Sequence, residues 1–189
     1  MITLHIFTEE ISIKKVLDII LPQLISSEMK FRIYPHQGKD DLKKAIKSTV
    51  PLISKNLNSR IIIAIDNDNN DCLKLKNEIN DLVDISCPYK IRIIIQELEA
   101  WFLGDLTVVE KAFSKFKAST YSNKTEFRNV DTIINPSYKL LKIIPDYSKS
   151  SFLPKQSTAE KIAKYLNIYK NKSDSFNQFI GAVKELCSV

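Results

Sequence analysis

The chain has 189 residues, with 28 Lys or Arg against 22 Asp or Glu and a formal net charge of +6. Its length suits one domain with a small appendage, and no window holds the roughly 18 consecutive apolar residues that a membrane helix needs. The three cysteines have no paired spacing, which argues against a disulfide framework or a structural zinc site. We therefore expect a cytoplasmic protein with no signal peptide and no membrane segment.

The positive charge is unevenly distributed along the chain. Residues 1–100 carry 14 basic and 14 acidic side chains, whereas residues 101–189 carry 14 basic and 8 acidic ones. A basic half joined to a neutral half with acidic clusters suits a polyanionic substrate such as nucleic acid. A lysine-rich, solvated helical surface would have the same composition, so the charge alone leaves both interpretations open.

The first hundred residues alternate predicted strands and helices. Apolar runs predict strands at 2–7, 31–34, 60–65 and 91–95. Apolar spacing and capping residues predict helices at 12–23 with Ser12 as cap, from 40 or 41 to 47, from 72 with Asp71 as cap, and at 97–103. This order predicts an α/β fold with an open, mostly parallel four-stranded sheet flanked by helices.

Beyond residue 105 the pattern becomes helical. Helices are predicted at 108–116, 137–143, 158–169 and 175–186. Asp105 is expected to cap the first of them, and Trp101 to anchor the core rather than stack on a base. We therefore expect an α/β domain at 1–105 and a basic helical C-terminal extension at 106–189 that packs on it.

Two acidic clusters follow predicted strands. Glu9 and Glu10 come after the first strand, and Asp66 and Asp68 follow the third in an Asp-Asn-Asp sequence. Ligands bind at the carboxyl ends of the strands in open α/β sheets, and converging carboxylates need a cation or a proton between them. Oxygen ligands of this kind favour Mg²⁺ or Mn²⁺, so the pattern predicts a divalent-metal site. Asp and Asn in a plain strand-to-helix turn are the alternative.

Several other residues are candidates at the same edge. Glu97 and Glu99 follow the fourth strand, where either could bind a second metal or simply favour a helix N-terminus. Lys39 follows the second strand and could pair with a phosphate or be a solvated lysine. His36 is a less favoured candidate for a general base, and His5, inside a strand, is expected to be structural.

A Glu after the first strand and an Asp-x-Asp after the third resemble the Toprim domain of topoisomerases, primases and the nucleases associated with overcoming-lysogenization-defect (OLD) ATPases. The resemblance implies Mg²⁺ binding and phosphodiester chemistry, with Glu9 or Glu10 in the role of the Glu and with Asp66 and Asp68 in the roles of the Asp residues. Toprim domains usually place Gly after that Glu, and this chain has Glu10 there, so the strand-to-helix turn is expected to differ.

A second resemblance covers nearly the whole chain. It rests on segments 9–12, 38–42, 66–68, 71–72, 97–105, 135–137 and 173–176. Together they resemble a bacterial family of small, uncharacterised Toprim-like proteins that are often encoded beside AAA or ABC-type ATPases in phage-defence islands. The resemblance implies an ATPase partner and a role as an effector in anti-phage defence.

The leading hypothesis is a Mg²⁺- or Mn²⁺-dependent nuclease acting on DNA or RNA. Its catalytic candidates are Glu9, Glu10, Asp66, Asp68 and Lys39. Its metal-ligand candidates are Glu9, Asp66, Asp68 and Glu97. The main alternative is a non-catalytic Toprim-like module that binds a partner ATPase, and a third is a phosphotransfer domain with Asp66 as nucleophile.

Overall fold

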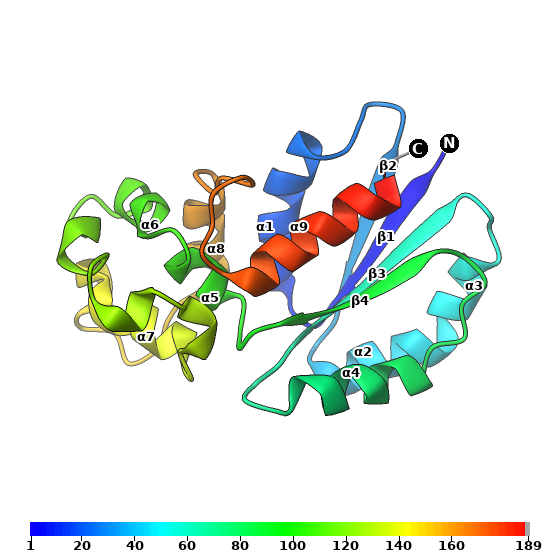
Figure 1. The fold of residues 1–189 in the computed structure, drawn as a ribbon, viewed down its shortest axis with the longest axis horizontal. Coiled ribbons are helices and arrows are strands. Elements are labelled where there is room, and N and C mark those ends of the chain that lie inside the picture. The colour runs from blue at the N-terminus through cyan, green and yellow to red at the C-terminus, as the bar shows by residue number, and fades with distance from the viewer. Residues whose placement is uncertain (188–189) are drawn as a thin grey trace.

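Four parallel strands form the centre of the molecule in the computed structural model, which describes residues 1–187 (Figure 1). The strands are β1 (Thr3–Thr8), β2 (Lys30–Pro35), β3 (Ser59–Asp66) and β4 (Tyr89–Ile94). They lie in the order β2-β1-β3-β4, and every neighbouring pair is parallel. The predicted α/β fold class is confirmed, and the strand bounds differ from the predicted ones by no more than two residues.

Helices cover both faces of the sheet (Figure 1). One face is covered by α1 (Ile11–Ile20) and α9 (Asp174–Cys187), and the other by α2 (Lys39–Ser48), α3 (Val50–Ser54) and α4 (Cys72–Asp81). Successive side chains of a strand point to opposite faces, so Ile62 packs in one apolar cluster and Ile61 and Ile63 in the other. This double burial explains why β3 is an almost continuous run of isoleucine.

A helical lobe, residues 99–163, lies beside the carboxyl ends of the strands (Figure 1). Its helices are α5 (Glu99–Leu103), α6 (Leu106–Ala112), α7 (Pro136–Ile143) and α8 (Lys155–Ala163). The described residues also form five short 3₁₀ turns, at Leu21–Gln23, Ala118–Thr120, Thr125–Phe127, Val130–Thr132 and Pro145–Tyr147. One apolar cluster continues from the sheet into the lobe, and α8 packs on α1. The division at residue 105 stays a prediction.

Two of the predicted helix caps are present, and a third is wrong. The Asp71 side chain accepts from the backbone N–H groups of Leu73 and Lys74, and that of Asp105 accepts from Thr107. Helix α1 begins at Ile11, and the hydroxyl of Ser12 donates to Oε2 of Glu10 at 3.1 Å instead of capping the helix. The Ser12 side chain therefore donates to the first acidic cluster, Glu9 and Glu10, rather than to the helix backbone.

Other predicted helices differ at their ends. Helix α5 begins at Glu99 rather than at residue 97, α6 at Leu106 rather than 108, and α8 ends at Ala163 rather than 169. Helix α3 was not predicted; Pro51 lies in its first turn, where proline is compatible with a helix.

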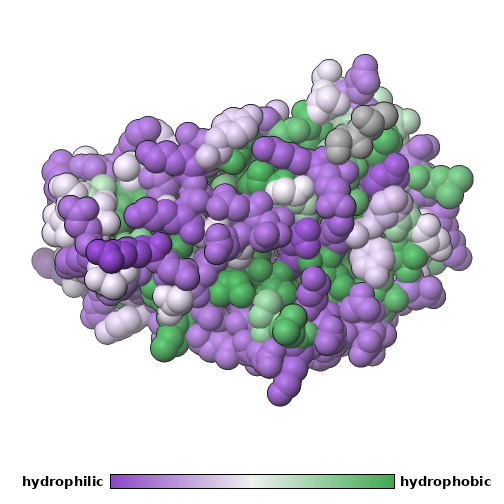
Figure 2. Space-filling model, viewed as in Figure 1, coloured by the Kyte–Doolittle hydropathy of each residue, from purple (hydrophilic) through white to green (hydrophobic). Residues whose placement is uncertain are grey.

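The predicted core role of Trp101 is confirmed. Its ring is fully buried, and its indole N–H donates to Oγ of Ser175 on α9 at 3.1 Å. Hydrophilic side chains cover most of the face shown in Figure 2, with apolar ones in patches near its centre. In residues 1–187, every helix is too short or too polar to cross a bilayer.

Candidate functional site

Glu9 directly follows strand β1, and Asp66 is the last residue of the neighbouring strand β3. The parallel register pairs Thr8 with Ala64, which places the two acidic residues side by side at the carboxyl edge. Oε2 of Glu9 accepts a hydrogen bond from the backbone N–H of Asp66 at 3.2 Å. Their exposed fractions are only 7% and 3%. The fold thus brings together the first residues of the two acidic clusters.

Burial makes both carboxyl groups hard to ionise. Burial raises the pKa of Glu9 to about 7, against the opposing effects of Lys39 and the hydrogen bond from Asp66. Burial also raises the pKa of Asp66 well above its usual value, and the charges of nearby glutamates add to that effect. In the described part of the chain, Oδ1 of Asp66 is buried and has no hydrogen-bond partner. A proton or a cation at this position would therefore be favourable.

Asp68 lies at the rim of this edge and is paired with a lysine. Its Oδ2 is 2.6 Å from Nζ of Lys39, and about half of its side chain is exposed. Asp68 and Asn69 have φ angles of 47° and 61°, in the left-handed region that Asp and Asn tolerate. Gly38, with φ 96°, precedes Lys39 and allows the turn into α2. The structure thus places two predicted site residues in one ion pair.

The loop after β3 is held in place by Gln96, a residue that sequence analysis missed. Oε1 of Gln96 accepts from Nδ2 of Asn67 at 2.8 Å and from the backbone N–H of Asn69 at 2.7 Å. The carbonyl of Gln96 accepts from the N–H of Asp68 at 3.0 Å. Its position two residues after the end of β4 is the signal that could have identified it, because that position lies beside the end of β3.

The two glutamates after β4 lie at the same edge. Glu99 is 1% exposed, and among residues 1–187 neither of its carboxyl oxygens has a hydrogen-bond partner. Burial raises its pKa to about 7, with Lys155 opposing and Glu97 adding to the rise. Oε2 of Glu97 is also buried and lacks a partner within the described residues. Glu99 is among the groups that raise the pKa of Asp66, so it belongs to this edge.

Lys155 is the second site residue that sequence analysis missed. It begins helix α8 in the helical lobe, and its Nζ lies 3.5 Å from Oε1 of Glu10. Burial lowers the pKa of Lys155, but the surrounding carboxylates, chiefly Glu99 and Glu10, raise it overall. Lys155 therefore brings positive charge from the second half of the chain to the carboxyl groups that follow or end strands β1, β3 and β4. We call this group of side chains the acidic edge; it consists of Glu9, Glu10, Asp66, Asp68, Glu97 and Glu99.

A groove opens beside these residues. It has a volume of about 710 Å³ and runs between the start of α1, the loop from β2 to α2, and the start of α8. Its lining residues are Glu10, Ile11, Ser12, Pro35, His36, Gln37, Gly38, Lys155 and Gln156. The mixture of acidic, basic and neutral polar groups suits a ligand with phosphate and hydroxyl groups.

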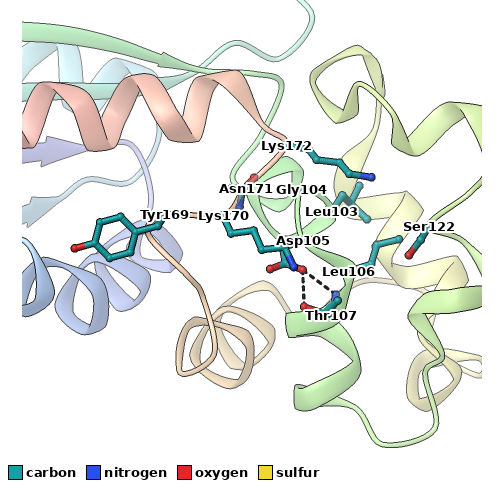
Figure 3. A pocket seen from close by; sticks show the side chains of 10 residues that line it. All are labelled: Leu103, Gly104, Asp105, Leu106, Thr107, Ser122, Tyr169, Lys170, Asn171 and Lys172. Carbon is teal, nitrogen blue, oxygen red and sulfur yellow. Dashed lines mark hydrogen bonds between the residues drawn. The ribbon is translucent and has the colours of Figure 1, made fainter.

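A second concavity, of about 350 Å³, is shown in Figure 3. It lies between residues 103–107 and 169–172, and Ser122 completes its wall. Asp105 there accepts hydrogen bonds from the N–H and the hydroxyl of Thr107, so its carboxylate is used as a helix cap (Figure 3). Because the acidic-edge residues do not line this pocket, we do not assign it to the same site.

The carboxylates at the edge have the right chemistry for Mg²⁺ or Mn²⁺, which prefer oxygen ligands. In residues 1–187, however, no three side chains from His, Cys, Asp and Glu are arranged so that they could hold a metal ion. Asp68 is paired with Lys39. Oxygens of Asp66 and Glu99 that lack a hydrogen-bond partner within residues 1–187 are the groups that a cation would satisfy. The predicted ligands Glu9, Asp66, Asp68 and Glu97 therefore stay a prediction.

Comparison with known proteins gives a family but no activity. No curated protein and no solved structure matches the chain significantly. Residues 8–184 match the family described as "Domain of unknown function (DUF4276)", and this range includes both acidic clusters and Lys155. The chain therefore belongs to the DUF4276 family.

Proposed function

We propose that the chain is a Mg²⁺- or Mn²⁺-dependent nuclease that hydrolyses phosphodiester bonds of DNA or RNA. The observation that carries the proposal is the contact between Glu9 and Asp66 at the carboxyl edge of a parallel sheet, where such folds bind ligands. Both carboxyl groups are buried, and Oδ1 of Asp66 lacks a partner among the described residues. Buried carboxyl groups with a strongly raised pKa are a common feature of catalytic sites.

Lysines on two sides of the acidic edge support a phosphate-containing substrate. Lys39 lies at the start of α2 and Lys155 at the start of α8, and each is paired with a carboxylate of the edge. A lysine ammonium can bind a phosphate oxygen as a point charge. In this proposal, the two lysines hold the phosphodiester over the edge, and their carboxylate partners keep them there before the substrate binds.

The metal would be held by Glu9 and Asp66, joined by Asp68 after it turns away from Lys39. When bound, a divalent cation supplies charge stabilisation and lowers the pKa of a water ligand. The rotation of Asp68 is compatible with its exposure, because its side chain is about half exposed and lies in a loop. The same rotation would release Lys39 for a phosphate oxygen. Glu97 and Glu99 lie at the same edge and would be the further carboxylate ligands of the metal.

Cleavage assays with purified protein test this proposal. The protein is incubated with plasmid DNA and with total RNA in Mg²⁺, Mn²⁺ or EDTA. We expect metal-dependent cleavage that Glu9→Gln and Asp66→Asn abolish. Asp18→Asn, which removes an exposed surface pair with Lys14, serves as a matched control and should retain cleavage. Thermal melts check that the inactive variants fold.

A non-catalytic binding module is the second candidate. The ion pair between Lys39 and Asp68 favours it, and so does the lack of a ready three-ligand group in residues 1–187. The relation to Toprim domains, the ATPase partner and the role in phage defence are also proposals, which rest on the resemblance in sequence. Co-purification with the product of a neighbouring ATPase gene tests the partner. Unchanged phage protection by Asp66→Asn would favour the binding module.

A further inference from the structure

The imidazole of His36 is fixed by the end of strand β1. Its Nδ1 lies 3.0 Å from the carbonyl oxygen of Thr8, and its backbone N–H donates to the same oxygen at 2.9 Å. A carbonyl oxygen can only accept, so Nδ1 carries the hydrogen and Nε2 of the neutral ring carries the lone pair. The ring also stacks on Phe7, with centroids 5.9 Å apart and planes 19° apart. Both position and tautomer are therefore set by the fold.

His36 lies beside the acidic edge and lines the groove of about 710 Å³. Thr8, which accepts its hydrogen bonds, directly precedes Glu9. The backbone N–H of Gly38 donates to the carbonyl of Glu9 at 3.1 Å, so the loop that carries His36 is attached to the residue that the proposed function places at the metal. Within residues 1–187, Nε2 of His36 makes no hydrogen bond.

The other charged groups that line the groove, Glu10 and Lys155, are already engaged with partners. Glu10 accepts from the hydroxyl of Ser12 through Oε2 and from Lys155 through Oε1. Lys155 is kept cationic by the carboxylates around it. Lys39, next to the groove, is paired with Asp68. Neither lysine can accept a proton while it is charged. Among the described residues, Nε2 of His36 has a lone pair without a hydrogen-bond partner, so it is an available proton acceptor in the groove.

We propose that Nε2 of His36 is the general base of this site, an assignment that rests on the nuclease function proposed above. Nε2 takes a proton from the attacking water as the water oxygen forms its bond to phosphorus. The bond from phosphorus to the leaving sugar oxygen breaks, and that oxygen takes a proton from solvent. The imidazolium returns its proton to solvent, so one phosphodiester and one water give one phosphomonoester and one alcohol.

Kinetics with chemical rescue test this assignment. His36→Ala should lower the rate of metal-dependent cleavage by about 100-fold or more, the usual contribution of a general base. Added imidazole should restore part of the rate. His36→Asn, which can keep the hydrogen bond to Thr8 but has no base at Nε2, should be as slow as His36→Ala. His5→Asn is the control, because His5 is the chain's other histidine and contacts Tyr34 instead. It should retain wild-type cleavage.

A second measurement does not depend on activity. Nitrogen NMR of the histidine rings should show His36 with hydrogen on Nδ1, and a short oligothymidylate should shift its Nε2 resonance but not the resonances of His5. An active wild type together with an active His36→Ala, or hydrogen on Nε2 of the neutral ring, would overturn the assignment and leave the nuclease proposal standing. A wild type that cleaves nothing in Mg²⁺ or Mn²⁺ would overturn both.

Discussion

Nζ of Lys155 lies 3.5 Å from Oε1 of Glu10, and this pair connects the start of α8 with the end of β1. Helix α8 packs on α1, so docking of the helical lobe brings a cation to the acidic edge. Burial lowers the pKa of Lys155, but Glu99, Glu10 and other carboxylates raise it overall. The charge balance of the edge therefore depends on the second half of the chain.

Removal of this cation should destabilise the protein moderately. In Lys155→Ala, Glu10 and the buried Glu99 lose their opposing charge. The exposed fractions of the Lys155 and Glu10 side chains are 35% and 37%, so solvent screening limits the expected loss to about 1 kcal/mol. Urea denaturation at pH 7.5 measures the change. Lys14→Ala, which breaks an exposed helix pair, is the control, and an equal loss in both variants would contradict a special role for Lys155.

The metal-free protein should become less stable as the pH rises from about 4.5 to about 7. Burial raises the pKa of Glu9 to about 7 and has the same effect on Glu99, so in this window the folded state binds more protons than the unfolded state. The stabilisation is complete below the unfolded pKa and is lost as the pH approaches the folded pKa. For Glu9 the loss is roughly 3 kcal/mol at most.

Glu9→Gln separates this effect from other titrations. The variant removes the ionisation, so its unfolding free energy relative to wild type should increase between pH 5 and pH 7.5 in EDTA. Glu28→Gln, on an exposed loop, should show a constant difference. If Glu9→Gln also shows a constant difference, the carboxyl group of Glu9 does not titrate in this window. Excess Mn²⁺ should restore the stability of the wild type at pH 7.5.

Lys39 should compete with metal for Asp68. In Lys39→Ala, Asp68 loses the partner that lies 2.6 Å away, and Mn²⁺ affinity should rise by about threefold, in line with a weak, partly exposed ion pair. Cleavage should nevertheless fall, because the proposed phosphate ligand is missing. Calorimetry and plasmid cleavage measure the two effects. Lys43→Ala, which breaks a similar pair with Glu78, should change neither, and weaker Mn²⁺ binding by Lys39→Ala would contradict the competition.

Gln96 should control the order of the loop that carries Asp68. Its side-chain oxygen accepts from Asn67 and Asn69, and an alanine removes both bonds. Hydrogen exchange of the Asn69 amide should accelerate in Gln96→Ala, and cleavage should fall by about tenfold because the ligand is less well positioned. Gln23→Ala, which removes a helix-end contact on the surface, should have no such effect. Unchanged exchange at Asn69 would show that Gln96 does not hold the loop.

The strands and the meeting of Glu9 with Asp66 could be predicted from sequence. The isoleucine run of β3 identified a strand covered on both faces, and the alternation of strands and helices implied parallel order. In a parallel sheet, residues that follow two neighbouring strands must lie at one edge. In the structure β1 and β3 are neighbouring parallel strands, and Glu9 accordingly lies beside Asp66.

The position of Lys155 could not be predicted, because it depends on how α8 docks against α1. No periodic pattern in the sequence specifies a contact between residues so far apart. The greater burial of Glu99 was also missed, because it depends on where α5 begins. A start at residue 97 would have assigned Glu97 and Glu99 to the first helical turn, whereas only Glu99 lies within the helix.

Titration of the protein with Mn²⁺ by calorimetry tests the central claim most directly. We predict that the wild type and Asp18→Asn bind Mn²⁺ with the same affinity, and that Asp66→Asn and Glu9→Gln lose at least tenfold in affinity, about 1.4 kcal/mol. All four proteins should be folded in thermal melts. Equal Mn²⁺ affinity in the wild type and in Asp66→Asn would show that the acidic edge of the sheet is not a metal site.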